Sequence, residues 1–302
     1  MKVLYSEKYG ASGISFDTFG KSKVVAEHLP AVGIEVVEPE VLTIKQVRRA
    51  HTAEYVDALR TGIPRGLATS QGLGWTPSLF KAVRASSGGV FQAANMALVT
   101  GEPVGSLSSG LHHARADRGQ GFCTINGLAI TALLLADRGY RTLILDFDAH
   151  CGGGTAELIA GNPLISQVDV SVHSYDEYEA GKRTHLFIAD SDSYMSTISR
   201  ALEVASDGPT FDVVLYNAGM DVHEKAGGVA GITTEIVEAR EELTFRWLMD
   251  HNLPVAWVLA GGYSSGAFPV EEVAALHLLT AKAAQHMSEV RVQRMKSEGE
   301  LR

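Results

Sequence analysis

Residues 142–150 read TLILDFDAH, an apolar run that ends in alternating acidic and histidine residues. A short unbroken apolar run is typical of a parallel strand that is buried on both faces. Residues two apart in extended chain face the same side, so Asp146, Asp148 and His150 can converge where the strand ends. Two carboxylates and an imidazole are costly to bury unless a positive charge joins them. The stretch therefore predicts a central strand with a divalent-metal site at its end. An acidic loop with a hydrogen-bonded histidine is the alternative.

Strands and helices are expected to alternate on both sides of this stretch. Further extended segments are predicted at residues 2–6, 35–37, 104–107, 168–173, 213–217 and 255–259. Helical spacing of apolar residues is found at residues 21–29, 53–61, 76–99, 127–137, 232–250 and 270–288. Gly88 and Gly89 are expected to interrupt the third of these helices. The alternation predicts an α/β fold with a mostly parallel central sheet and helices on both faces. We expect a single domain at residues 1–290, followed by a charged and frayed tail at residues 291–302.

The 302-residue chain has the composition of a globular protein with an acidic balance. Its 26 Lys and Arg against 35 Asp and Glu give a net charge of −9, which argues against direct binding to nucleic acid but leaves cationic substrates open. The longest apolar stretch, residues 128–136, is much shorter than the about 20 residues of a membrane-spanning helix. No apolar signal region follows the N-terminus, and two cysteines cannot form a disulfide framework. We therefore expect a cytoplasmic protein without a membrane segment.

A second acidic group follows another predicted strand, in the sequence NAGMD at residues 217–221. The carboxyl ends of parallel strands meet at one edge of a sheet, so Asp221 can join Asp148 and His150 there. Three protein ligands with one open position are the pattern of a catalytic zinc site, whereas a structural site is closed by four. Oxygen-rich ligation also leaves Fe²⁺ possible.

Two further clusters carry groups that could move protons or stabilise charge. His112 and His113 adjoin the glycine-rich stretch at residues 119–123, GQGFC, and histidines in such a place suit proton transfer near neutral pH. Tyr263 follows Gly261 and Gly262 after the predicted strand at residues 255–259, where its hydroxyl could donate to a developing oxyanion. The alternatives are exposed loop histidines and a turn tyrosine packed on the core.

Taken in order, five motifs resemble those of the histone deacetylase family, which shares its fold with the arginases. They are HTAEYV at 51–56, LHHA at 111–114 with GFC at 121–123, DFDAHCGGG at 146–154, SVH at 171–173 and GGY at 261–263. The similarity spans about residues 16–265. It is nearest to the class IV branch and its bacterial relatives. The resemblance implies an arginase/deacetylase-like fold.

The resemblance also implies a role for the matching polar residues. The ligand set of Asp148, His150 and Asp221 would bind zinc. His113 would act as general base, and later as acid, for the hydrolytic water. His112 would be held by Asp146 as a second, electrostatic histidine. Tyr263 would polarise the acyl carbonyl.

Substrate and ion contacts follow from the same resemblance. Phe122 would form one wall of an acyl-lysine tunnel, and the carbonyl of Gly121 could accept the substrate N–H. Gly261 and Gly262 would shape the substrate side of the tyrosine loop. A monovalent cation, K⁺, is implied beside the backbone of Asp146, Asp148 and His150, with Ser171.

One departure from the family pattern bears on catalysis. Gly153 stands where the family commonly has an Asp or Asn that orients the second histidine. We therefore expect His113 to lack an anionic partner, to be held more loosely and to have a lowered pKa. Cys123 and Cys151 adjoin the catalytic motifs. The simpler interpretation is that both thiols are buried and pack as small apolar groups, and the alternative is that they make the site sensitive to oxidation.

The sequence thus predicts a zinc-dependent amide hydrolase that removes an acyl group from the ε-amine of lysine in a protein or peptide. The main alternative is a small-molecule amidohydrolase, such as an acetylpolyamine deacetylase, with the same catalytic residues. An arginase-like enzyme would need a further Asp at position 152, which is glycine. A zinc-binding pseudoenzyme stays open because of Gly153. Tyr175 and Tyr178 are candidates for the tunnel mouth. Acyl-chain length and oligomeric state are left open.

Overall fold

The computed structural model describes residues 1–11, 17–109 and 111–300. Its strands are β1 (Lys2–Leu4), β2 (Glu35–Val37), β3 (Val104–Ser106), β4 (Thr142–Asp146), β5 (Ile165–Ser171), β6 (Thr184–Ile188), β7 (Val213–Gly219) and β8 (Val255–Ala260). Its α-helices are α1 (Asp17–His28), α2 (Ile44–Val47), α3 (Ala53–Thr61), α4 (Arg65–Ala68), α5 (Leu79–Thr100), α6 (Gly127–Ala136), α7 (Gly153–Ile159), α8 (Tyr194–Ser206), α9 (Thr234–Asp250) and α10 (Val270–Glu300). Two short 3-10 helices are η1 (Glu7–Tyr9) and η2 (Leu29–Val32).

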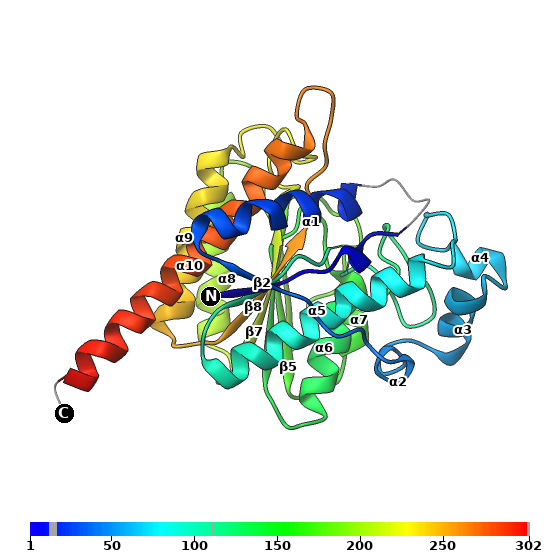
Figure 1. Ribbon diagram of the computed structural model, residues 1–302, viewed down its shortest axis with the longest axis horizontal. Helices are drawn as coiled ribbons and strands as arrows, with labels where there is room; N and C mark the ends of the chain where they lie inside the picture. The colour runs from blue at the N-terminus through cyan, green and yellow to red at the C-terminus, as the bar shows by residue number, and fades with distance from the viewer. Residues whose placement is uncertain (12–16, 110, 301–302) are drawn as a thin grey trace.

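All eight strands form one parallel sheet in the order β2-β1-β3-β8-β7-β4-β5-β6. The predicted α/β architecture with a central parallel sheet is therefore confirmed (Figure 1). Every residue of β4 is buried, as its unbroken apolar sequence predicts. β4 pairs with β5 on one side and β7 on the other, so their carboxyl ends lie side by side.

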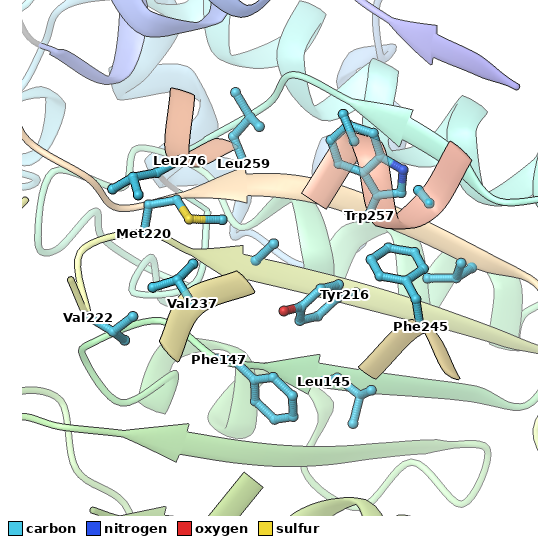
Figure 2. Close-up of a cluster of buried hydrophobic side chains, with 14 of the residues drawn as sticks. Leu145, Phe147, Tyr216, Met220, Val222, Val237, Phe245, Trp257, Leu259 and Leu276 are labelled. Carbon is cyan, nitrogen blue, oxygen red and sulfur yellow. The ribbon is translucent and has the colours of Figure 1, made fainter. Parts of the chain in front are cut away.

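Helices cover both faces of the sheet because side chains alternate along each strand. In β4, Leu143 and Leu145 join a core with α1, α8, α9 and α10, whereas Ile144 joins a second core with α3, α5 and α6. Figure 2 shows the first core, in which Tyr216 of β7 lies beside Phe245 of α9 and Trp257 of the neighbouring β8 lies beside α10. The aromatic rings of Tyr216 and Phe245 meet edge to face at 6.0 Å.

The predicted interruption of the third helix is wrong, since α5 runs unbroken through Gly88 and Gly89. These glycines are packing positions. A Cβ at Gly88 would lie closer than 3.0 Å to the backbone oxygen of Glu40, and one at Gly89 would overlap the hydroxyl of Tyr9. Their missing side chains let the long helix lie close to the neighbouring segments, and this gain outweighs the low helix propensity of glycine.

The last helix is longer than predicted. α10 continues to Glu300, so residue 290, where we expected the domain to end, lies inside it. The far end of α10 extends away from the rest of the molecule (Figure 1). Arg291 is tied back through a hydrogen bond of 3.1 Å from Nη2 to the carbonyl of Leu253. No helix among the described residues is long and apolar enough to cross a membrane.

Candidate metal centre and active site

Three predicted ligands meet where β4 and β7 end. One donor atom from each of Asp148, His150 and Asp221 lies within 4.8 Å of the other two. His150 Nδ1 is 3.2 Å from Asp148 Oδ1 and 3.2 Å from Asp221 Oδ2. Ligands bound at about 2.0–2.1 Å to a tetrahedral Zn²⁺ are separated by about 3.3 Å. The spacing therefore fits a divalent metal.

The charge balance of this cluster also favours a cation. Asp148 and Asp221 are buried, and the carboxylate of each lies 3.2 Å from His150 Nδ1. Burial alone would lower the pKa of His150, but hydrogen bonds to Asp148 and Asp221 outweigh burial and raise it to about 10. Two carboxylates thus create a demand for positive charge, which a metal ion satisfies.

His112 is a buried imidazole with a carboxylate behind it, as the resemblance implies. Its Nδ1 lies 2.9 Å from Asp146 Oδ2, and its Nε2 lies 3.5 Å from Asp148 Oδ1. Asn217 Nδ2 donates to the other oxygen of Asp146 at 2.8 Å. Burial disfavours the charged imidazole, but Asp146 and Asp148 outweigh it and raise the pKa of His112 to about 10. The two carboxylates therefore favour the charged form of His112.

His113 has an anionic partner, so the prediction that it lacks one is wrong. Its Nδ1 lies 2.9 Å from Oδ2 of Asp176, a residue that sequence reasoning did not single out. The pKa of His113 is nevertheless lowered, to about 4, because burial and the charge of His112 disfavour protonation. The direction of the shift was predicted, but its cause is burial beside a cation and not a missing carboxylate. The one sequence signal pointing to a rearranged partner is Gly153.

The predicted site residues gather around a deep cavity of about 20 Å³. Its lining includes His112, His113, Gly121, Phe122, Asp148, His150, Gly261 and Tyr263. Gly261 has φ 46°, and a Cβ there would overlap the carboxylate of Asp221, so only glycine fits. Gly262 is turned away from the cavity, toward Met220 and Val273. Tyr263 is anchored by a 2.9 Å hydrogen bond from its backbone N–H to the carbonyl of Ala226.

A wider cavity of about 570 Å³ opens above the deep one and forms its mouth. Phe122 and Tyr175 stand at this mouth with 46% and 47% of their surfaces exposed. The Tyr175 ring meets the His113 ring edge to face at 5.0 Å. Tyr178 turns inward and hydrogen-bonds the carbonyl of His185 at 3.3 Å. Of the two tyrosines proposed for the mouth, only Tyr175 lies there.

The structure bears on the prediction for the two cysteines but does not test the implied K⁺ site. Cys123 and Cys151 are both buried, and burial raises the pKa of each thiol, that of Cys151 to about 12. A protonated buried thiol reacts slowly with oxidants, which favours the packing interpretation. Ser171 lies at the end of β5 and donates to Asp169 Oδ1 at 2.8 Å. A K⁺ site beside it stays a prediction.

The model of one protein family, the histone deacetylase domain, matches residues 18–279. The chain belongs to the histone deacetylase domain family. An uncharacterized protein of Picosynechococcus is 29% identical over 262 residues, which cover 83% of this chain and 85% of that protein. Histone deacetylase 2 of Arabidopsis thaliana is 30% identical over 192 residues, covering 60% of this chain and 49% of that one.

Solved structures support the fold assignment. The acetylpolyamine aminohydrolase of Burkholderia pseudomallei superposes with a TM-score of 0.75 at 17% identity, covering 95% of this chain and 99% of the other. The arginase/deacetylase-like fold predicted from the motifs is thus confirmed. Membership of the family makes the chain a hydrolase that acts on amides, in a family that is generally metal-dependent.

Proposed function

We propose that this protein is a zinc-dependent deacylase that removes a short acyl group, acetyl first of all, from the ε-amine of lysine in a protein or peptide. One observation carries the proposal: Asp148 and His150 of the Asp148–His150–Asp221 cluster line one small cavity together with His113 and Tyr263. A divalent metal bound by that cluster supplies positive charge that polarises the acyl carbonyl.

In this proposal His113 transfers protons, and His112 stabilises negative charge. Because His113 Nδ1 bonds Asp176, its Nε2 is the nitrogen that takes a proton from the attacking water. Its lowered pKa keeps it neutral and able to do so at pH 7. As the C–N bond breaks, the same nitrogen returns the proton to the departing lysine amine. His112 keeps its charge and offsets the developing negative charge.

Tyr263 and the mouth residues act on the substrate. The hydroxyl of Tyr263 donates to the oxyanion that forms from the acyl carbonyl. Phe122 and Tyr175 flank the methylene stem of the lysine, and the carbonyl of Gly121 accepts the amide N–H. The products are the unmodified lysine side chain of the protein or peptide and the short-chain carboxylate released from the acyl group.

Cavity size supports a short acyl chain on a bulky carrier. The cavity of about 20 Å³ that Asp148, His150 and Tyr263 line would also have to hold the metal and the attacking water, so it leaves little room for the acyl group and favours a short chain. The mouth is open, with two exposed aromatic rings that suit an extended peptide. A small acylated amine is the second candidate, because the fold matches an acetylpolyamine aminohydrolase and the net charge is −9.

Turnover measurements on zinc-loaded and metal-stripped protein test this proposal. The substrates are lysine peptides that carry acyl chains from acetyl to myristoyl, together with an acetylated polyamine. We expect acetyl-lysine turnover that needs the metal and falls by at least about 100-fold in Tyr263→Phe. Preference for the polyamine would move the assignment to the small amine. Preference for myristoyl would contradict the short-chain assignment, and no turnover of any amide would contradict the deacylase assignment.

A further inference from the structure

The carboxylate behind His113 comes from the segment between β5 and β6, outside every motif used to recognise the family. Asp176 adopts a left-handed backbone conformation with φ 62°, and its side chain is fully buried. Its Oδ2 accepts from His113 Nδ1 at 2.9 Å and from the backbone N–H of Gly154 at 3.0 Å. Its Oδ1 accepts from Gln120 Nε2 at 2.9 Å and from the guanidinium of Arg115. Four donors therefore hold the carboxylate in one orientation.

Gly153 makes this arrangement possible. A Cβ at position 153 would lie 2.8 Å from Asp176 Oδ1 and would overlap the backbone oxygen of the same residue. An acidic side chain at position 153 and the observed position of Asp176 therefore exclude each other. Gly153 lacks the side chain that orients the second histidine elsewhere in the family. The space left by that missing side chain is occupied by Asp176, which contacts His113 instead.

We propose that Asp176 is the positioning residue of His113, with Arg115 and Gln120 fixing its carboxylate and Gly153 making room for it. The inference rests on the proposed function only in taking His113 as the proton-transfer group. A buried carboxylate at Nδ1 keeps the Nδ1–H tautomer and leaves Nε2 free to accept a proton, and it resists rotation of the ring.

The position of Asp176 links the orientation of His113 to the segments that line the substrate entrance. Tyr175, at the mouth, directly precedes Asp176, and its ring packs against that of His113. Gln120 adjoins Gly121 and Phe122 and lines the same mouth. The two segments that hold the carboxylate are thus the two that would contact the substrate, so contacts at the mouth bear directly on how His113 is oriented.

Asp176→Asn is the sharpest test because it keeps size and tolerates a positive φ. Arg115 and Gln120 both donate at the Oδ1 position, and one of them is charged, whereas the Gly154 N–H is the one backbone donor at the Oδ2 position, so the amide oxygen should face Arg115 and Gln120 and the NH₂ should face His113. Nδ1 must then accept, and the proton moves to Nε2, the wrong tautomer for a base. We expect kcat on acetyl-lysine peptide to fall by at least about 100-fold, with KM within about twofold and zinc content unchanged.

The second readout does not depend on activity. Long-range ¹H–¹⁵N spectra of the zinc-loaded protein, assigned with a His113→Ala variant, report which ring nitrogen of His113 carries the proton. We expect Nδ1–H in the wild type and Nε2–H in Asp176→Asn. Glu157→Gln is the matched control, since it removes the charge of the second carboxylate that pairs with Arg115, at an exposed position, and should leave tautomer and kcat unchanged.

The outcomes separate the two proposals. Wild-type kcat or an unchanged His113 tautomer in Asp176→Asn would overturn the role of Asp176. Asp176→Gly, which suits the left-handed backbone, gives the same decision if the Asn variant does not fold. If the wild type turns over no amide but the tautomer still changes, the positioning role stands and the proposed function fails.

Discussion

His112 and His113 are neighbours in the chain, and a carboxylate lies behind each ring. The pKa of His112 is raised to about 10, whereas that of His113 is lowered to about 4 by burial and the neighbouring cation. The two carboxylates differ in their own partners. Asp146 accepts a hydrogen bond from the neutral amide of Asn217, which does not neutralise its charge, so Asp146 favours the charged form of His112 strongly. Asp176 is shared with the Arg115 guanidinium, so it orients His113 while favouring its charged form less strongly.

We predict that the single substitution Gly153→Ala reduces both activity and stability. The added methyl would overlap the backbone oxygen of Asp176 and displace its carboxylate from His113. We expect kcat to fall by about 10–100-fold and unfolding to become easier by about 1–3 kcal/mol, with zinc content retained. Steady-state kinetics, urea unfolding and metal analysis measure these effects.

Gly66→Ala is the control for that substitution. Gly66 lies in α4, and a Cβ there meets no atom within 4 Å. The control should leave activity unchanged and stability the same or slightly higher, because alanine restricts the unfolded chain more than glycine does. Full activity in Gly153→Ala would mean that Asp176 tolerates displacement and would contradict our account of position 153.

Among the elements, α9 supports the metal-ligand loops from behind through one buried cation. Arg240 is fully buried and pairs with the buried Glu241. Its Nη1 also donates to the carbonyl of Phe147 at 3.2 Å and to that of Gly219 at 2.6 Å. Those carbonyls belong to the segments that carry Asp148 and Asp221. One guanidinium thus joins the ends of β4 and β7.

We predict that Arg240→Met destabilises the protein by about 3–5 kcal/mol, because it leaves a buried carboxylate without its counter-charge. Urea unfolding measures the loss. Adding Glu241→Gln should recover part of it, since the unpaired charge is then removed. The control is Arg246→Met on the exposed side of the same helix, which should change stability by less than about 0.5 kcal/mol. Equal effects at positions 240 and 246 would contradict this role for Arg240.

For the whole molecule, two cores on opposite faces of the sheet hold the strand ends in place. The end of α10 lies outside both cores. Met287 is buried in the first core, whereas residues 292–294, 296 and 297 are exposed. The boundary near residue 290 therefore stays a prediction about folding, although helical structure continues past it.

Truncation tests that boundary. Removing residues 296–302 should leave the melting temperature within about 2 °C and activity unchanged, because Lys296 and Ser297, the residues of that segment whose side chains the structure describes, are exposed. Removing residues 287–302 should lower stability by about 2–5 kcal/mol, because the core loses Met287. Thermal unfolding of both variants measures the difference. A large loss from the shorter deletion would show that the folded unit extends beyond residue 290.

Much of the fold could be predicted because strand and helix periodicity are local properties. The strand at residues 35–37 and the helix at residues 53–61 were predicted with the bounds observed for β2 and α3. β6, α7 and α8 were missed. α7 begins with two glycines, and β6 is an edge strand that is only half buried, so neither has the usual pattern of its type.

By itself the sequence determined the alternation of strands and helices, the parallel sheet and the convergence of Asp148, His150 and Asp221 at one edge. These follow from apolar runs, from side chains alternating along extended chain and from the shared direction of parallel strands. Only the tertiary structure decided the partner of His113, because Asp176 is 63 positions away in the chain. That contact depends on how one loop folds over a glycine that has no side chain, and no local pattern records it.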